Sequence, residues 1–183
     1  MTNLIDIIQK NLQYPALQKV DPNTQDVKHE ADETEITKIG QAAIPAVLTG
    51  LFMLSRTDEG CLKIMNTTES VNTLAILFHN DETEVVQKIA NYTGLSVNQA
   101  KSHLENIADE SLRVVNELAA GSCEKLKHFM NDQRHDILVH LPASLQLGNF
   151  LEDEHLDDKT NKMEGPVSNL MHAIENKLSQ GGD

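Results

Sequence analysis

Hydrophobic residues recur every three or four positions along most of the chain, which is the spacing of an amphipathic α-helix. The clearest pattern covers residues 85–118 and predicts a helix, a tight turn at Gly94, and a longer helix opened by Ser96. In the longer helix, seven apolar positions should be buried together and three polar positions should face solvent. The buried set is Val97, Ala100, Leu104, Ile107, Leu112, Val115 and Leu118, and the solvent-facing set is Asn98, Lys101 and Glu105.

Residues that favour helix ends support this interpretation. Ser96 and Gln99 have the spacing of a capping box, in which each side chain bonds to the backbone N–H of the other residue. Thr67-Thr68-Glu69 predicts the start of a helix that carries the apolar residues of 71–78, and Ser122 predicts the start of another that carries Leu126 and Met130. These signals divide the second half of the chain into short helical units.

The same periodicity predicts helices over residues 4–12, 36–54, 58–65 and 166–180. Pro45 lies inside the second of these, so we expect either a kink or a fresh helix there. No segment alternates apolar and polar residues as a half-buried strand would. The sequence therefore predicts an all-α, multi-helix bundle of roughly seven to nine helices.

A chain of 183 residues fits a single domain, here residues 1–183. Sliding the sequence against itself by 64 positions aligns Leu48 with Leu112 and Leu62 with Leu126. This weak similarity suggests two pseudo-repeated helical halves, 31–80 and 82–151, followed by the C-terminal helix 166–180.

Charge and cysteine content limit the class of protein. The net charge of −13, from 28 acidic and 15 basic residues, repels phosphate backbones and argues against nucleic acid as a partner. The start of the chain lacks the basic and apolar regions of a secretory signal, and no apolar run has the length of a membrane span. We therefore expect a cytoplasmic protein, not bound to a membrane, with Cys61 and Cys123 as reduced, buried thiols.

A second interpretation of the 85–104 hairpin is a helix-turn-helix that reads DNA. In a helix-turn-helix, the recognition helix packs closely against the helix before it. Three small residues here fit that packing: Ala90 on the first helix, Gly94 in the turn and Ala100 on the second helix. Asn and Gln side chains can bond to adenine edges in the major groove. In this alternative the DNA-binding surface is Ser96, Val97, Asn98, Gln99, Lys101 and Ser102.

The sequence contains no convincing catalytic or metal-binding constellation. Three acidic residues precede histidines at helical spacing, but only Glu152 and His155 match the Glu-x-x-His form of a di-iron bundle. Cys123 and His128 lack an oriented third group for nucleophilic catalysis. Phosphate-binding, dinucleotide and G-x-S-x-G motifs are missing. We therefore expect no enzyme activity, no cofactor and no metal. The other two acid–histidine pairs are Glu124/His128 and Asp136/His140.

Residues 86–107 resemble the YidB-like family of small helical bacterial proteins of unknown function. The marks of the resemblance are Gly94, Leu95, Ser96 and Ala100, in an apolar helix, a T-G-L-S turn and an amphipathic helix. The segment 44–51, with its Pro, also looks like a segment of that family. The resemblance implies an all-helical fold and supplies no reaction, cofactor or catalytic residue.

Strong amphipathic helices without converging catalytic groups favour a non-enzymatic protein-interaction or scaffold module. Binding would use an apolar groove or a helix face, with a protein partner or with a second copy of the chain. The alternative function is a helix-turn-helix DNA-binding regulator that uses the 85–104 hairpin.

Overall fold

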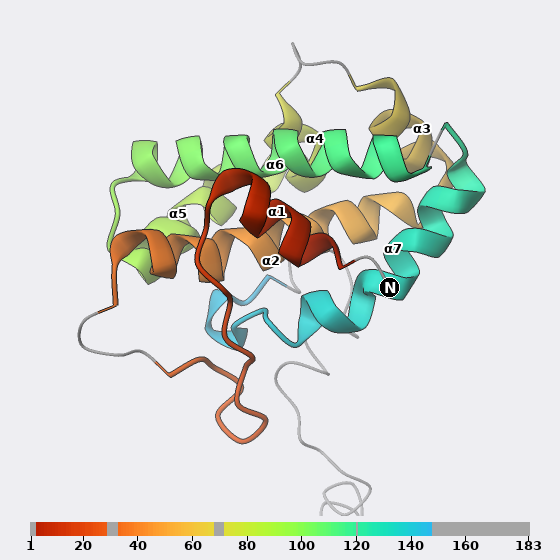
Figure 1. Cartoon of the computed structure of the whole chain (residues 1–183). Helices are drawn as coiled ribbons and strands as arrows, with labels where there is room; N and C mark the ends of the chain where they lie inside the picture. The colour runs from red at the N-terminus through yellow and green to blue at the C-terminus, as the bar shows by residue number, and fades with distance from the viewer. Residues whose placement is uncertain (1–2, 29–32, 68–71, 120, 148–183) are drawn as a thin grey trace, which may run out of the picture.

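A computed structural model describes residues 3–28, 33–67, 72–119 and 121–147 (Figure 1). These residues form seven α-helices and two short 3-10 helices with no strand, which confirms the predicted all-α bundle. In chain order the elements are α1 (Leu4–Leu12), α2 (Glu35–Ser55), α3 (Asp58–Asn66), α4 (Thr73–Phe78), η1 (His79–Asp81), α5 (Glu82–Thr93), α6 (Val97–Ala119), α7 (Cys123–Leu138) and η2 (Ala143–Leu145).

Helix α2 forms the centre of the bundle. From Ile39 to Ser55 all but one of its residues are buried, because α5, α6 and α7 pack around it. Figure 1 shows α2 running behind α1 and beneath α6. Helix α2 is also the one described helix long and apolar enough to cross a membrane. Since most of it is buried inside the protein, its apolar character is that of a core helix.

Pro45 lies inside one continuous α2, so of the two outcomes expected there, a kink or a fresh helix, the fresh helix is wrong. Proline removes a backbone donor in a helix interior and costs about 3 kcal/mol there. The Thr49 hydroxyl donates a hydrogen bond to the Pro45 carbonyl over 2.7 Å. Packing on every side of α2 outweighs the lost hydrogen bond and keeps the helix continuous. The apolar pattern of the sequence did not show that α2 would be surrounded in this way.

The hairpin between α5 and α6 has the predicted turn and cap. Gly94 ends α5 in the left-handed conformation, with φ of 76°, and its N–H donates to the Ala90 carbonyl over 2.9 Å. The Ser96 N–H donates to the Gln99 side chain over 3.2 Å, and the Gln99 N–H donates back to the Ser96 hydroxyl over 3.4 Å. The capping box is therefore confirmed.

The middle of the apolar stripe on α6 is buried as predicted, and its two ends are not. Val97 is 41% exposed and Leu118 is 42% exposed, so their predicted burial is wrong. Both lie at the ends of α6, which reach the edges of the bundle in Figure 1. Asn98 is exposed, and Lys101 and Glu105 are half-exposed. The confirmed buried positions are Ala100, Leu104, Ile107, Leu112 and Val115.

Helices α2 and α3 meet at a sharp corner that requires glycine. A Cβ on Gly60 would lie 1.9 Å from the Leu54 carbonyl oxygen, far inside van der Waals contact. The Thr57 hydroxyl caps α3 by accepting from the Gly60 N–H over 3.0 Å. The sequence predicted that residues 67–69 begin the helix that is α4. Thr67 instead ends α3 as its C-cap, and the N-cap of α4 is Asn72, so the prediction is wrong for Thr67. Thr68 and Glu69 lie outside the described residues.

Cys61 on α3 and Cys123 on α7 form a disulfide, with their Cα atoms 5.7 Å apart. The prediction of two reduced, buried thiols is therefore wrong: the two sulfurs are bonded to each other, and only Cys61 is buried, since Cys123 is partly exposed. Sequence spacing could not reveal the pair, because 62 positions separate the two cysteines and the contact depends on how α3 packs against α7.

A long helix followed by a shorter one occurs twice, as α2–α3 and as α6–α7. This order is compatible with the halves 31–80 and 82–151, and the duplication itself stays a prediction. The expected C-terminal helix 166–180 lies outside the described residues.

Candidate functional site

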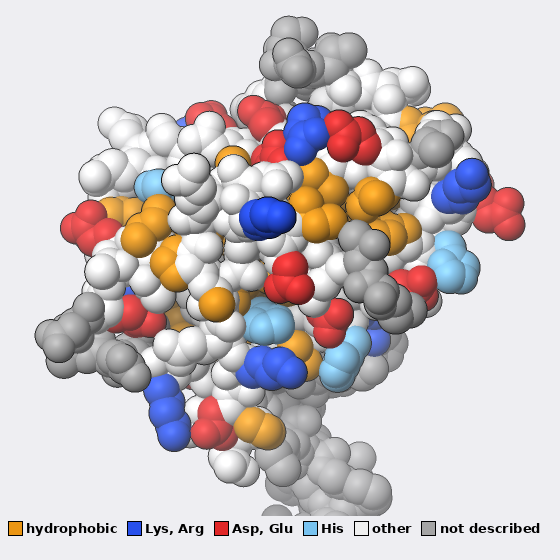
Figure 2. All heavy atoms as spheres, viewed as in Figure 1, with side chains coloured by type: hydrophobic (Ala, Val, Ile, Leu, Met, Phe, Trp, Pro, Cys, Tyr) orange, Lys and Arg blue, Asp and Glu red, His pale blue; other side chains and the backbone are white. Residues whose placement is uncertain are grey.

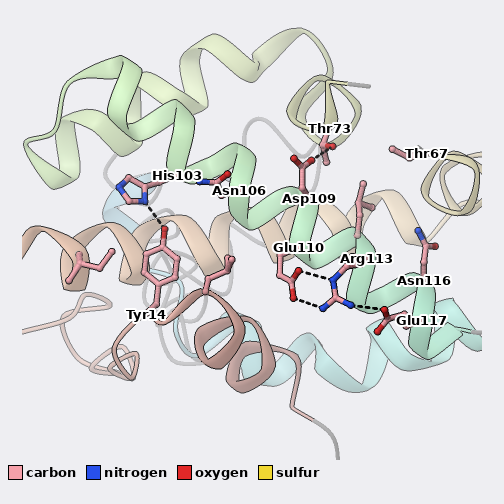
Figure 3. A pocket seen from close by; sticks show the side chains of 13 residues that line it. Tyr14, Thr67, Thr73, His103, Asn106, Asp109, Glu110, Arg113, Asn116 and Glu117 are labelled. Atoms are coloured by element: carbon pink, nitrogen blue, oxygen red, sulfur yellow. Dashed lines mark hydrogen bonds and ion pairs between the residues drawn. The ribbon is translucent and has the colours of Figure 1, made fainter. Parts of the chain in front are cut away.

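A groove of about 1390 Å³ follows the outward face of α6, with α1 on one side and α3 and α4 on the other (Figure 3). We call it the α6 groove. Three of its lining residues are aliphatic, Leu12, Ile36 and Leu112, and most of the others are polar or charged. Its lining residues are Leu12, Tyr14, Ile36, Thr67, Thr73, His103, Asn106, Asp109, Glu110, Leu112, Arg113, Asn116 and Glu117.

Tyr14 and His103 form one end of the groove. The Tyr14 hydroxyl and His103 Nδ1 lie 2.6 Å apart, and the two rings meet edge to face with centroids 6.0 Å apart. Tyr14 also packs over Gly40 of α2, where a Cβ would lie 2.9 Å from the tyrosine ring. Burial raises the pKa of Tyr14 to about 12, so its hydroxyl stays protonated at neutral pH.

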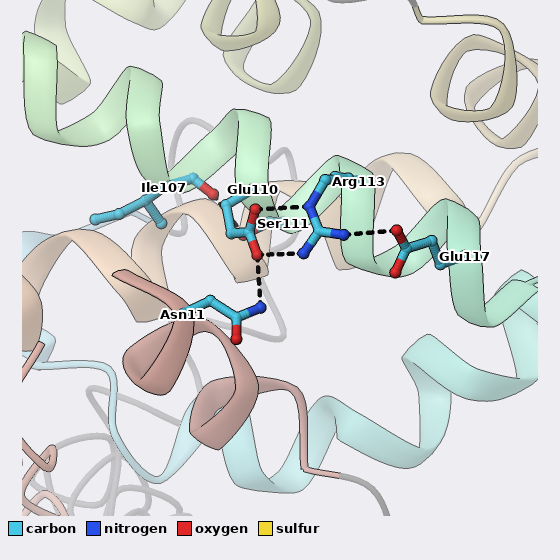
Figure 4. Close-up of polar contacts among 6 residues, drawn as sticks. All are labelled: Asn11, Ile107, Glu110, Ser111, Arg113 and Glu117. Carbon is cyan, nitrogen blue, oxygen red and sulfur yellow. Dashed lines mark hydrogen bonds and ion pairs between the residues drawn. The ribbon is translucent and has the colours of Figure 1, made fainter. Parts of the chain in front are cut away.

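Arg113 organises the carboxylates in the middle of the groove (Figure 4). Its guanidinium donates two hydrogen bonds to Glu110, at 2.8 and 2.6 Å, and a third to Glu117 at 2.5 Å. The Asn11 side chain of α1 donates to Glu110 over 2.7 Å. Hydrogen bonds from Arg113 lower the pKa of Glu110, so this carboxylate remains ionised. Exposed pairs like these add little stability, and their main effect is to fix where the charges point.

Two further hydrogen bonds fix the opposite side of the groove. The Thr73 hydroxyl of α4 donates to the Asp109 carboxylate over 2.6 Å. The Asn116 side chain donates to the Ile64 carbonyl of α3 over 3.2 Å. Polar side chains of α6 therefore connect the helices that form the walls.

The groove carries three carboxylates, Asp109, Glu110 and Glu117, against the single guanidinium of Arg113. In Figure 2, acidic and basic side chains line α6 above a patch of hydrophobic side chains that continues toward α1. No described group of three His, Cys, Asp or Glu residues has the geometry to hold a metal ion. The arrangement is suited to binding a cationic, partly apolar ligand.

The residues of the alternative DNA-binding surface lie together at the beginning of α6, away from most of the groove. Val97, Asn98 and Ser102 are exposed there. The Ser96 and Gln99 side chains bond to each other in the capping box, with 2.6 Å between Ser96 Oγ and Gln99 Oε1. The ammonium of Lys101 pairs with Glu82 of α5 at 2.9 Å and with Glu105 at 3.9 Å. Acidic neighbours thus surround the one cation of this surface.

The acid–histidine pairs singled out in the sequence do not form sites in the described residues. His128 is paired with Asp132 at 3.1 Å, not with Glu124. Nδ1 of His140 lies 2.7 Å from the Asp136 backbone carbonyl, not from its carboxylate. Glu152 and His155 lie outside the described residues. Since Cys123 is in a disulfide, it is not a free nucleophile beside His128.

Sequence reasoning missed the groove because the walls beside α6 come from segments far from it in the sequence. Tyr14 and His103 are 89 positions apart, and nothing in the local pattern pairs them. One signal was available: Glu110, Arg113 and Glu117 have the i, i+3 and i, i+4 spacing of ion pairs on one helix face. That spacing predicted the polar face of α6, but it gave no information on α1, α3 and α4, which form the walls of the groove.

Comparisons with protein-family models, with curated proteins and with solved structures found no match to this chain. Kinship with the YidB-like family and a cytoplasmic location therefore stay predictions from the sequence.

Proposed function

We propose that this chain is a non-enzymatic protein-interaction module that binds a basic, amphipathic segment of a partner protein in the α6 groove. The observation that carries the proposal is the row of acidic side chains, held in fixed positions along an open groove that also has aliphatic residues in its lining. Neither a reaction nor a cofactor is needed for this role.

The size and shape of the groove favour a peptide over a small molecule. Pockets for drug-sized ligands enclose about 300–1,000 Å³, and the α6 groove is larger and open. At a rise of 1.5 Å per residue, the stretch of α6 from His103 to Glu117 is about 21 Å long. A partner helix of about four turns would lie along it.

Charge selects the partner. Asp109, Glu110 and Glu117 outnumber the basic groups of the groove, and the whole chain has a net charge of −13. Lysine and arginine on the partner would meet this surface, while its leucines would cover Leu12 and Ile36 in the groove lining. Because Glu110 and Glu117 are already oriented by Arg113, little further ordering is required on binding.

The experiment is a fluorescence anisotropy titration of the full chain with a labelled Leu/Lys amphipathic peptide and its Leu/Glu counterpart. The Leu/Lys peptide should bind saturably, more weakly at high salt, and the Leu/Glu peptide should not bind. The double variant Glu110→Lys/Glu117→Lys should reduce affinity by about tenfold or more. Glu84→Lys, an exposed reversal on α5 outside the groove, is the matched control and should bind like the natural chain. Equal affinity for the two peptides would contradict the proposal. So would an equal loss of affinity for the Leu/Lys peptide in Glu110→Lys/Glu117→Lys and in Glu84→Lys.

DNA binding by the α5–α6 hairpin is the second candidate, because the two helices and the Gly94 turn have the order of a helix-turn-helix. Its test is retention on random duplex DNA at low salt, where phosphate contacts are strongest. We expect no retention, since the net charge of −13 repels phosphate and Lys101 is the one cation of the proposed DNA-binding surface. Retention that Lys101→Ala abolishes would favour the DNA-binding function instead.

A further inference from the structure

Three sulfur atoms from two helices meet at the corner between α3 and α7. The Sδ atom of Met65 lies 3.8 Å from Cys61 Sγ and 3.4 Å from Cys123 Sγ, and the two cysteine sulfurs are bonded to each other. Cys61 and Met65 are one turn apart on α3, so they share a face of that helix. Cys123 is the first residue of α7. We call this group the sulfur cluster.

We propose that the sulfur cluster, once its disulfide is reduced, is a binding site for one monovalent soft metal ion, Cu(I). Thiolate and thioether sulfurs are the ligands that Cu(I) prefers. At a metal–sulfur bond of about 2.3 Å, three sulfurs around a trigonal ion lie about 4 Å from one another. Met65 already sits near this distance from both cysteines, so only the cysteine sulfurs need to move apart.

The surroundings suit a site of this charge. Two thiolates and one Cu(I) ion carry a net charge of −1, and the N-terminus of α7 at Cys123 favours negative charge. Cys61 is fully buried, while Cys123 and Met65 are partly exposed, which leaves an approach from solvent. The described residues offer no cluster of three His, Cys, Asp or Glu groups, so the borderline ion Zn²⁺ would lack its usual ligand set here.

The chemistry balances in two steps. A small-molecule thiol reduces the Cys61–Cys123 disulfide, in which two RSH become RSSR and the protein gains two electrons and two protons. Cu(I) then binds the two cysteine sulfurs with release of both thiol protons, and Met65 adds a neutral sulfur. The disulfide form and the metal-bound form therefore exclude each other. Metal binds only when the Cys61–Cys123 pair is reduced.

The test is an anaerobic Cu(I) titration of the full chain against the chromophoric chelator bathocuproine disulfonate, with oxidised and reduced protein compared. The reduced chain should hold one equivalent of Cu(I) and the oxidised chain none. The volume-conserving variant Met65→Leu should weaken binding by about tenfold or more. Met53→Leu replaces another partly buried methionine, on α2, and should bind like the natural chain. Circular dichroism of each variant confirms that it is folded.

Copper X-ray absorption of the loaded chain separates a three-sulfur site from simple binding by two thiolates. We expect three sulfurs at about 2.3 Å in the natural chain, and two in Met65→Leu. No Cu(I) retained by the reduced chain would overturn the proposal. Equal affinity of Met65→Leu and the natural chain, or displacement of the bound ion by Zn²⁺, would overturn it as well.

Discussion

The Tyr14 hydroxyl and the His103 imidazole are 2.6 Å apart and connect the segment after α1 to the outward face of α6. This contact forms one end of the α6 groove, and it joins parts of the chain that local sequence patterns leave unrelated. Removal of the hydroxyl in Tyr14→Phe should reduce the free energy of unfolding by about 1 kcal/mol, because His103 loses a hydrogen-bond partner. Urea unfolding at neutral pH measures the change, and an unchanged midpoint would show that the contact contributes nothing.

Tyr14 also predicts a loss of stability in alkali. Burial raises its pKa to about 12 from the ordinary value of 10.0, so the folded state favours the neutral phenol. This contribution is complete below the unfolded pKa and disappears as the pH rises from about 10 to about 12. The unfolding free energy of the natural chain should therefore fall relative to that of Tyr14→Phe over this pH range. A natural chain that keeps or increases its stability relative to Tyr14→Phe between these pH values would contradict the assignment to Tyr14.

Gly60→Ala should destabilise the corner between α2 and α3 by about 2 kcal/mol, since the added methyl group would overlap the Leu54 carbonyl and force the helices apart. Urea unfolding of the variant gives the cost directly. Asn98→Ala, on the exposed side of α6, is the control and should change stability by less than about 0.5 kcal/mol. An equally small effect at Gly60 would mean that the corner opens freely.

The capping box at the start of α6 gives a quantitative prediction for the hairpin. Ser96→Ala should cost about 1 kcal/mol, because the Gln99 N–H loses its acceptor. A double-mutant cycle with Gln99→Ala should show that the two single effects are not additive, because the side chains also bond to each other. Ser102→Ala, an exposed position one turn into α6, should be nearly neutral. Fully additive effects would mean that the box does not act as a unit.

The disulfide closes a loop between residues 62 positions apart, which should contribute about 4 kcal/mol through the restricted unfolded chain. Addition of a thiol reductant should therefore lower the urea midpoint of the natural chain. The variant Cys61→Ser/Cys123→Ser is the control, and reductant should leave its midpoint unchanged. If reductant has no effect on the natural chain, the two cysteines are not joined in solution.

The helices were predictable where periodicity and end signals agreed. The Ser96 cap and the Gly94 turn depend on neighbouring residues, and both follow from local pattern. Pro45 shows the limit of this approach, because α2 continues through it only when the rest of the bundle surrounds it. The exposed ends of the stripe, Val97 and Leu118, show the same limit, since burial depends on where other helices stop.

The groove required tertiary structure. Glu110 and Arg113 are visible in the sequence as a helical ion pair, but the Asn11 side chain that also bonds Glu110 comes from α1, 99 positions away. The pairing of Cys61 with Cys123 likewise depends on the packing of α3 against α7. Contacts between distant segments decide the shape of a binding surface, and one sequence carries little direct information on them.

The most direct test of the proposed function is amide NMR of the isotope-labelled full chain titrated with the Leu/Lys amphipathic peptide. We expect chemical-shift changes to concentrate at groove residues of α6, such as His103, Asp109 and Glu117, and to be absent with the Leu/Glu peptide. Changes confined to the first turns of α6 around Asn98 would contradict the proposal that the α6 groove is the binding site, and so would the absence of any peptide-specific change.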